Sequence, residues 1–160
     1  MKTFLLYWNP FFSSYKLEHF LEDFDFPEGK DVLTEDDDPD CFPYEFNWSV
    51  IEHEKAHEGD RFIFVKVGYD KPTGIVGTGH FISEPYEGRD WSGQGRKTFY
   101  MDMEWESAVK ADSDKILPTN RLIEAIPEIE WTRGKAGIEV TPEIAARIEA
   151  LWKEHLESAK

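Results

Sequence analysis

Three features are scarce in this sequence of 160 residues: cysteine, long apolar runs and basic charge. Its single cysteine, Cys41, cannot form an intrachain disulfide, which favours a reducing compartment. No apolar run approaches the roughly 18 residues that a membrane span needs. The apolar start of the chain is interrupted by Asn9-Pro10 and lacks the small-residue cleavage site of a signal peptide. We therefore expect a cytoplasmic protein with no membrane partner.

Basic residues are outnumbered, with 18 Lys and Arg against 33 Asp and Glu and a net charge of −15. An acidic protein is a poor non-specific binder of nucleic acid, because contacts to phosphate supply most of that affinity. The acidic excess, however, lies mainly in the first sixty residues. The later part of the chain is nearly neutral and carries Arg89, Arg96 and Arg133, so one face could still accept a nucleic acid.

The length and the 40% hydrophobic content indicate one globular domain over residues 1–160. Its clearest signal lies in residues 59–85, where a β-branched and aromatic run, a turn-rich break and a second run predict an antiparallel hairpin. Gly77 and Gly79 fall inside the second strand, which favours a bulge, a bend or the close approach of another backbone. The hairpin is the expected frame of the fold.

Flanking segments supply the other predicted elements. We expect strands at residues 2–8 and 97–109, the latter burying alternate side chains up to Trp105, and a short polar helix before Glu58. Ser13 or Ser14 is the predicted cap of a first helix, and Thr141-Pro142 the predicted start of a last one. Residues 86–96 read as a loop, and residues 25–45 as an acidic insert whose carboxylate run is typical of a solvated loop, with Mg²⁺ or Ca²⁺ binding as the alternative.

No motif in the chain predicts catalysis, a metal or a cofactor. His53-Glu54-Lys55-Ala56-His57 matches the H-E-x-x-H pattern, but a glycine and a strand follow at once and no third ligand stands at a suitable spacing. Residues 74–79 do not match the dinucleotide fingerprint, and residues 92–97 do not match a phosphate-binding loop. Cys41 lacks a setting that would activate a nucleophile. A zinc hydrolase is thus the weakest of the functions considered.

The tryptophans carry the most information about function. Trp105 and Trp152 fit the buried pattern of their elements and are predicted core residues. Four others stand at strand ends or in loops beside polar residues: Trp8, Trp48, Trp91 and Trp131. They could be packing residues, or they could form a stacking pocket in which flat rings hold a base and amides read its edge. A cage of such rings also suits methylated groups.

In these features the sequence resembles the EVE branch of the PUA-like superfamily, which is related to the YTH domains. Trp8-Asn9-Pro10 resembles the end of the family's first strand, and Asn47-Trp48-Ser49 resembles the step whose tryptophan forms one wall of the cage. Gly59-Asp60 with the strand after it resembles a family signature, as do residues 74–85. Trp91 resembles the second wall, and residues 131–140 resemble the strand that precedes the last helix.

The resemblance implies an α+β fold, namely a PUA-like antiparallel or mixed β-barrel of five to six strands with flanking helices. It also implies a non-catalytic module that binds a modified base in DNA or RNA. Trp48 and Trp91 would stack on the base, with Trp8 or Trp131 as a further wall. The remaining predicted ligand-binding residues are Asn9, Asn47 and Ser49 at the edge of the base, and Arg133 with Arg96 at phosphate. The alternative is a protein-interaction domain that uses its acidic N-terminal region.

Overall fold

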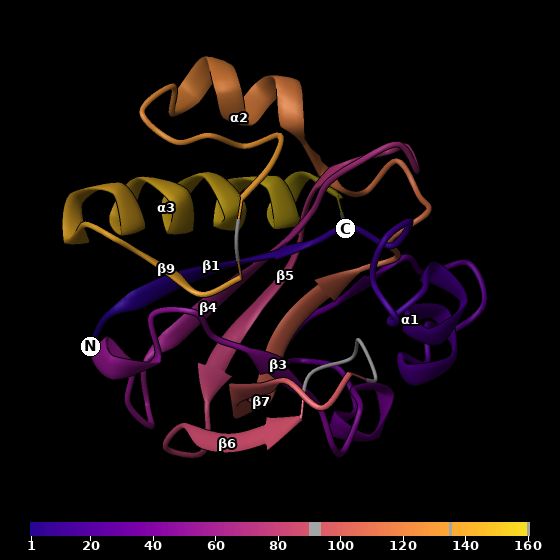
Figure 1. Ribbon diagram of the computed structural model, residues 1–160. Helices are drawn as coiled ribbons and strands as arrows, with labels where there is room; N and C mark the ends of the chain where they lie inside the picture. Colours follow the sequence, from indigo (N-terminus) through magenta and orange to yellow (C-terminus); the bar gives the residue numbers. More distant parts are fainter. Residues whose placement is uncertain (90–93, 135, 160) are drawn as a thin grey trace.

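The computed structural model describes residues 1–89, 94–134 and 136–159 (Figure 1). Its strands are β1 (Thr3–Trp8), β2 (Val32–Leu33), β3 (Asn47–Ser49), β4 (Arg61–Lys66), β5 (Gly74–Phe81), β6 (Tyr86–Arg89), β7 (Lys97–Val109), β8 (Leu117–Pro118) and β9 (Ile138–Val140). Its helices are α1 (Leu17–Asp23), α2 (Thr119–Ala125) and α3 (Pro142–Ala159), with 3-10 turns η1 (Pro39–Cys41) and η2 (His53–Lys55). The fold class is therefore α+β, as predicted.

Six of the strands form one path of pairings in the order β2-β7-β5-β4-β1-β9. The sheet is mixed because β1 runs parallel to β4 whereas the other pairs are antiparallel. The short strands β3 and β6 both pair with β7, and β8 pairs with β5. No pairing among the described residues joins β2 to β9, so the predicted barrel takes the form of an open, curved sheet.

The predicted hairpin is β4 and β5, which pair from Arg61 opposite His80 to Lys66 opposite Gly74. Its glycines allow the close approach of another backbone, as the sequence indicated. A Cβ atom at Gly79 would lie 2.1 Å from the carbonyl oxygen of Glu104 on β7, closer than any side chain can come. The register of β5 against β7 shifts between Thr78 and Gly79, which is the irregularity expected where one strand bends against another.

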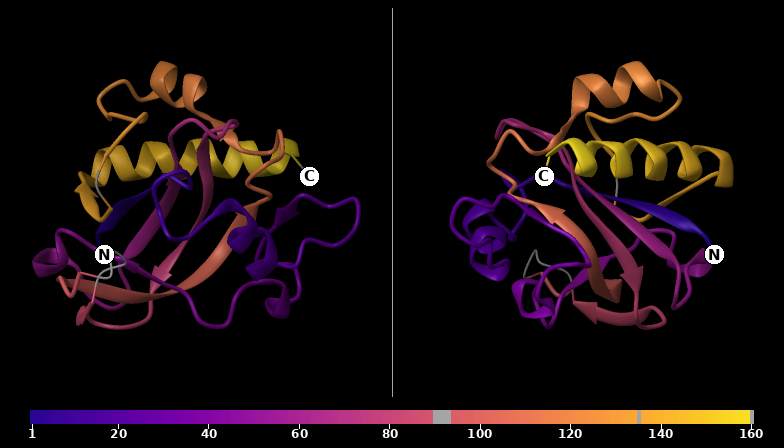
Figure 2. Two further views of the ribbon diagram at one scale, coloured as in Figure 1. Left: turned by 45° about the vertical axis from the view of Figure 1, so that its right-hand side comes forward. Right: turned by 180° about the vertical axis from the view of Figure 1, so that it is seen from behind.

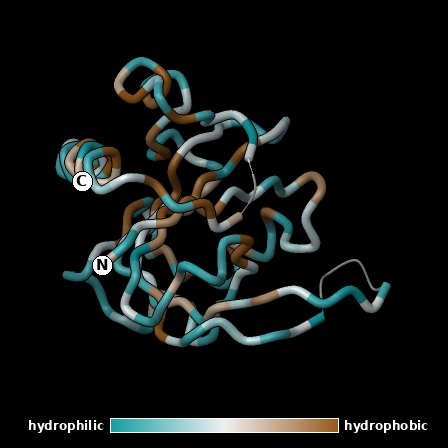
Figure 3. Tube along the Cα trace, turned by 60° about the vertical axis from the view of Figure 1, so that its left-hand side comes forward, coloured by the Kyte–Doolittle hydropathy of each residue, from teal (hydrophilic) through white to brown (hydrophobic). Residues whose placement is uncertain are grey.

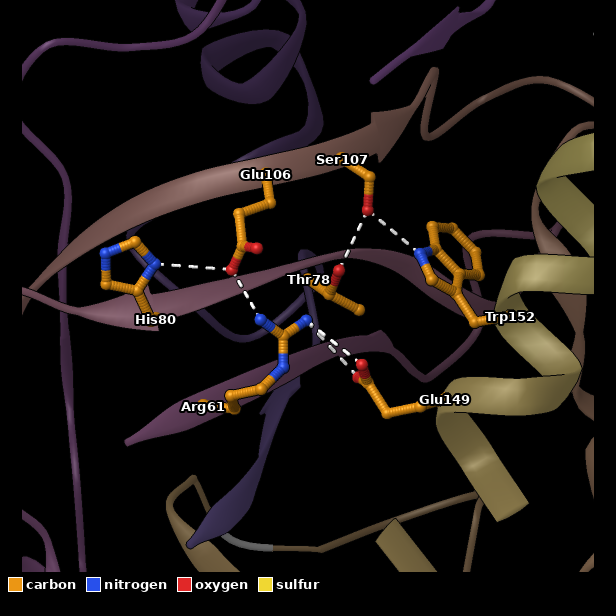
Figure 4. A network of polar contacts seen from close by, with 7 residues as sticks. All are labelled: Arg61, Thr78, His80, Glu106, Ser107, Glu149 and Trp152. Carbon is orange, nitrogen blue, oxygen red and sulfur yellow. Dashed lines mark hydrogen bonds and ion pairs between the residues drawn. The ribbon is translucent and has the colours of Figure 1, made fainter. Parts of the chain in front are cut away.

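Helices α2 and α3 lie together on one side of the sheet, whereas β3 and β6 lie on the other (Figures 1 and 2). Contacts between side chains hold α3 in place (Figure 4). Trp152 Nε1 donates to Ser107 Oγ at 2.9 Å, and Ser107 Oγ is 2.8 Å from Thr78 Oγ1. The predicted start of α3 is confirmed, because Thr141 Oγ1 accepts a hydrogen bond from Ile144 N.

Three local predictions are wrong. The first helix begins at Leu17 rather than after a serine cap, because Ser13 Oγ instead accepts from Tyr15 N and closes a tighter turn. The polar helix expected before Glu58 is only the turn η2. Part of the loop predicted at residues 86–96 is strand β6, which is paired along its full length with β7. Within the acidic 25–45 segment, β2 is buried against β7.

The core gathers where the strands meet the helices, and the hydrophobic segments lie there in Figure 3. Trp105 and Trp152 are buried in it, as predicted. Trp105 packs edge-on against Phe24, Phe62 and Phe64. Burial of each such ring contributes about 1.5–3 kcal/mol, which makes this cluster a main source of stability. No helix in the described ranges is long and apolar enough to cross a membrane.

Candidate nucleic-acid-binding site

A cavity of about 670 Å³ opens between the turn after β1, the strand β3, and the β6–β7 hairpin. These segments come from distant parts of the sequence, and β7 brings two of them together. Ser49 of β3 and Tyr86 of β6 both pair with Tyr100 of β7. The described residues that line the cavity are Tyr7, Asn9, Phe12, Ser13, Ser14, Tyr15, Asn47, Trp48, Ser49, Tyr86, Gly88, Arg89, Tyr100 and Ala136.

Trp48 lines this cavity and is half-buried. It lies parallel to Phe46, with ring centroids 6.1 Å apart and planes 8° apart. Phe64 and Tyr15 meet it edge-to-face at 4.9 Å and 5.7 Å. These contacts fix the orientation of the indole before any ligand arrives, so that little side-chain entropy remains to be lost on binding.

Four tyrosines form further walls of the cavity, and the hydroxyl of each one donates a hydrogen bond to another group of the protein. The hydroxyls of Tyr7 and Tyr100 donate to the backbone oxygens of Glu130 and Arg89, at 2.6 Å and 2.7 Å. Those of Tyr15 and Tyr86 donate to the carboxylates of Asp23 and Asp102, at 2.8 Å and 2.6 Å. The rings are therefore held rigidly, and they offer the cavity flat apolar faces.

Three of these tyrosines, Tyr7, Tyr15 and Tyr86, have pKa values raised above the ordinary value of tyrosine. Burial, with the nearby Glu130 carboxylate, raises the pKa of Tyr7 to about 12. Burial and the hydrogen bond to Asp102 raise the pKa of Tyr86 to about 12. Burial and the bond to Asp23 also raise the pKa of Tyr15. These three side chains therefore bring no negative charge into the cavity near neutral pH.

The polar groups of the cavity are amides, hydroxyls and one guanidinium. Asn9 Oδ1 accepts from Phe11 N at 3.0 Å, which leaves its amide NH₂ to act as a donor. The side chains of Asn47 and Ser49 make no hydrogen bond to the rest of the described chain, and they can pair with the edge of a ligand. The exposed Arg89 donates to Gly95 O at 3.3 Å and keeps further N–H groups for an anion.

Four of the residues predicted from the sequence are brought together in this cavity: Asn9, Asn47, Trp48 and Ser49. Trp91 lies outside the described residues. Arg133 and Arg96 are exposed and are not among the residues that line the cavity. Binding of a ligand by these residues remains a prediction.

Trp8 and Trp131 do not line the cavity and need correction, because both are core residues at 0% and 1% exposure. The ring of Trp8 stacks on Phe20, and its Nε1 donates to Tyr15 O at 2.7 Å. Trp131 Nε1 donates to Ile126 O at 2.9 Å. Each indole N–H thus finds a partner inside the protein, and neither ring has a face left for a ligand.

The sequence reasoning missed the tyrosine walls. Tyr86 and Tyr100 become neighbours only through the pairing of β6 with β7, and the prediction of a loop at residues 86–96 excluded that pairing. The spacing of Tyr86 and Gly88, two residues apart, was the one feature that could have indicated a strand there. Gly88 leaves room for the Tyr100 ring, which a Cβ there would meet at 2.9 Å.

The histidines of the H-E-x-x-H segment do not have the arrangement that a zinc hydrolase needs. The H-E-x-x-H segment forms one 3-10 turn rather than an α-helix, so its histidines do not share a helix face. The His53 ring stacks on Phe99 at 3.8 Å, whereas His57 Nδ1 is 2.9 Å from Glu84. Within the described ranges, no group of three or more His, Cys, Asp or Glu residues is placed to hold a metal.

A second cavity, of about 470 Å³, lies between the sheet and α3, and its lining includes the carboxylates of Glu106 and Glu149. Figure 4 shows the partners of these two carboxylates. Arg61 Nη1 donates to Glu106, and its Nη2 lies 3.2 Å from Glu149. His80 Nδ1 is 3.3 Å from the same Glu106 oxygen. This internal pairing gives the cavity a structural role in fastening α3.

Comparisons with known proteins address the fold. No family model matches the sequence, and no curated protein matches it. Solved structures do match.

The crystal structure of the Mmi1 YTH domain matches this chain with a TM-score of 0.53 at 13% identity, over 99% of both chains. The Mmi1 YTH domain in complex with RNA has a TM-score of 0.53 at 11% identity, over 98% of this chain and 80% of that one. A further complex of mmi1 with RNA has a TM-score of 0.50 at 13% identity, over 94% of this chain and 80% of that one. The chain therefore has a YTH-like fold.

Proposed function

We propose that this protein is a non-catalytic module that binds single-stranded RNA and takes one modified base into the cavity beside Trp48. The observation that carries the proposal is the state of the Trp48 ring, which is fixed by Phe46, Phe64 and Tyr15 yet stays half-exposed where it lines the cavity. A large ring held in this way is suited to stack on another flat ring.

The rest of the cavity fits a base. The tyrosine rings supply further flat surfaces, whereas Asn47 and Ser49 supply the donors and acceptors that read the edge of a base. Arg89 stands at the same cavity and can pair with a phosphate. A base must leave its stack to enter such a site, and this is easiest in a single strand.

A modified base is favoured over an unmodified one because the walls are aromatic. A methyl group on the base adds apolar, polarisable surface, which aromatic cages recognise. The solved complexes of the YTH-like Mmi1 domain with RNA support RNA over DNA for this chain, through analogy of fold alone. The order of the motifs described above supports membership of the EVE branch within this wider fold.

The absence of catalysis is part of the proposal. Cys41 has its thiol pKa raised by burial and by the nearby carboxylates of Asp25 and Asp38, which makes it a poor nucleophile. Tyr7, Tyr15 and Tyr86 also have raised pKa values and do not supply a base near neutral pH.

The test is binding of a panel of short RNAs and DNAs, each carrying one methylated or unmethylated base, at one fixed salt concentration. We expect a methylated RNA to bind best. Trp48→Ala should weaken its binding by about 1–3 kcal/mol, since one stacked ring is lost. Trp48→Phe keeps a smaller ring and should lose less.

Thermal unfolding of each variant separates binding from folding. If Trp48→Ala unfolds the protein, Asn47→Ala takes its place, because the Asn47 side chain is exposed and the substitution leaves the backbone pairing of β3 with β7 intact. Equal binding of methylated and unmethylated strands, or full binding by a folded Trp48→Ala variant, would contradict the proposal.

A further inference from the structure

Three aromatic side chains form an exposed row beside the cavity. Phe11, Phe12 and Tyr69 are 57%, 63% and 78% exposed. Phe11 meets Phe12 edge-to-face at 5.0 Å and Tyr69 at 6.0 Å. The two phenylalanines belong to the connection between β1 and α1, and Tyr69 to the turn between β4 and β5, segments that lie side by side (Figures 1 and 2). A cluster of exposed large rings is costly in water and marks a binding surface.

The row is held in place by Asn9. Its Oδ1 accepts from Phe11 N at 3.0 Å, and its backbone oxygen accepts from Phe12 N at 3.1 Å. Gly68 has φ +104°, and a Cβ there would lie 2.6 Å from Asn9 Oδ1. The turn that carries Tyr69 can therefore approach Asn9 only because residue 68 has no side chain. Asn9 thus holds the segment of the two phenylalanines and lies directly against the turn that carries Tyr69.

The row continues the wall of the cavity. Phe12 belongs to both, since it lines the cavity and touches Phe11. Lys16 adds a positive charge, because its Nζ donates to Phe11 O at 3.0 Å and keeps further protons for an anion. An aromatic row with a cation beside it matches the pattern that follows a single-stranded nucleic acid, in which bases stack on rings and cations face the backbone.

We infer that Phe12, Phe11 and Tyr69 form a stacking platform for the nucleotides that flank the base in the cavity, so that the ligand is a strand rather than a single nucleoside. This inference rests on the proposed function. Three side chains are far fewer than the roughly 20–30 residues per side of a stable protein interface, whereas one ring matches one base. The platform and the cavity together read a modified base within its strand.

The experiment compares two kinds of probe for wild type, Phe11→Ala and Tyr69→Ala. One is a set of short RNAs with a central methylated adenosine, cytidine or uridine, and the other is the set of matching free nucleosides. For the RNA that binds best, each variant should raise Kd by about 5- to 150-fold, which is the loss of one stacked base. Kd for the matching nucleoside should not change.

Two controls sharpen the result. Ile123→Ala removes an exposed apolar side chain of α2 that belongs neither to the row nor to the cavity lining, and it should leave both Kd values unchanged. An RNA whose flanking nucleotides lack bases should bind wild type at least as weakly as the normal RNA binds Phe11→Ala. The variant should then lose nothing further, because the two changes remove the same contact.

The outcomes distinguish this inference from the proposed function. If Phe11→Ala and Tyr69→Ala bind the RNA as tightly as wild type while Trp48→Ala does not, the platform is wrong and the cavity stands. The platform is also wrong if the free nucleoside binds as tightly as the RNA. If wild type binds no RNA of the set, or Trp48→Ala binds like wild type, both proposals fail.

Discussion

At the scale of single residues, the hydroxyl of Tyr7 in the cavity makes a contribution to folding stability that depends on pH. Tyr7 OH donates to Glu130 O at 2.6 Å, and the pKa of Tyr7 is about 12 in the folded protein. In the unfolded chain a tyrosine ionises near its ordinary pKa of about 10. The unfolded state therefore loses this proton first as pH rises, so the stability that Tyr7 contributes is complete below pH of about 10 and disappears towards 12.

We expect Tyr7→Phe to be less stable than wild type near pH 7, because the hydrogen bond to the Glu130 carbonyl is lost, by about 0.5–1.5 kcal/mol. The gap between the two proteins should narrow as pH rises from about 10 towards 12, since only wild type has this hydroxyl to ionise on unfolding. Urea unfolding of both proteins across this range measures the gap. A gap that widens with pH would show that the hydroxyl does not carry the effect.

Single residues also show where reasoning from the sequence stops. Trp8 ends β1 and Trp48 lies in β3, and each stands next to an asparagine in the sequence. Trp8 is nevertheless buried, whereas Trp48 lines the cavity. The difference lies in long-range packing. Phe20 covers Trp8 and the carbonyl of Tyr15 accepts its N–H, and neither contact has a signature in the residues that flank Trp8.

At the scale of elements, α3 is fastened to the sheet by a buried polar contact (Figure 4). Ser107 Oγ accepts from Trp152 Nε1 and also bonds Thr78 Oγ1, and all three residues are buried. Ser107→Ala would leave both partners without a hydrogen bond. Leaving a buried donor unpaired costs about 1–3 kcal/mol, so we expect a loss of stability of at least that size in urea unfolding.

Ser158→Ala is the matched control on the same helix. Among the described residues, Ser158 Oγ bonds only the carbonyl of His155 within α3, so its loss should change stability by less than about 0.5 kcal/mol. Neither variant should alter RNA binding, because the cavity lies on the other side of the sheet. Equal stabilities for the two variants would mean that the Trp152 contact does not fasten the helix.

The elements that the sequence predicted best are those with strong local signals. The hairpin of β4 and β5 has β-branched runs bounded by glycine, and α3 has a Thr-Pro start, and both are confirmed. Strand β6 lacks such a run, and it forms because β7 is long enough to pair with both β3 and β6. The cavity depends on this pairing, which is why the Tyr86 and Tyr100 walls could not be predicted from the sequence.

At the scale of the whole molecule, the net charge of −15 sets how this protein can bind RNA. Most single-strand binders gain affinity by releasing counterions from phosphate. Here the cation that lines the cavity in the described structure is Arg89, and Lys16 stands beside the aromatic row. Affinity must therefore come mainly from stacking and from contacts to the edge of the base, which depend little on salt.

We predict a shallow salt dependence. Two phosphate contacts to a single strand give a slope of log K against log salt concentration of about −1.4. Measuring Kd for the RNA that binds best between about 50 and 200 mM salt tests this value.

Arg89→Ala should reduce the steepness of this slope by about 0.7, as one phosphate contact is removed. Lys153→Ala, which removes an exposed cation of α3 beside the second cavity, should leave it unchanged. A slope steeper than about −4 would mean that phosphate contacts dominate, and that the acidic surface of this molecule does not prevent electrostatic binding.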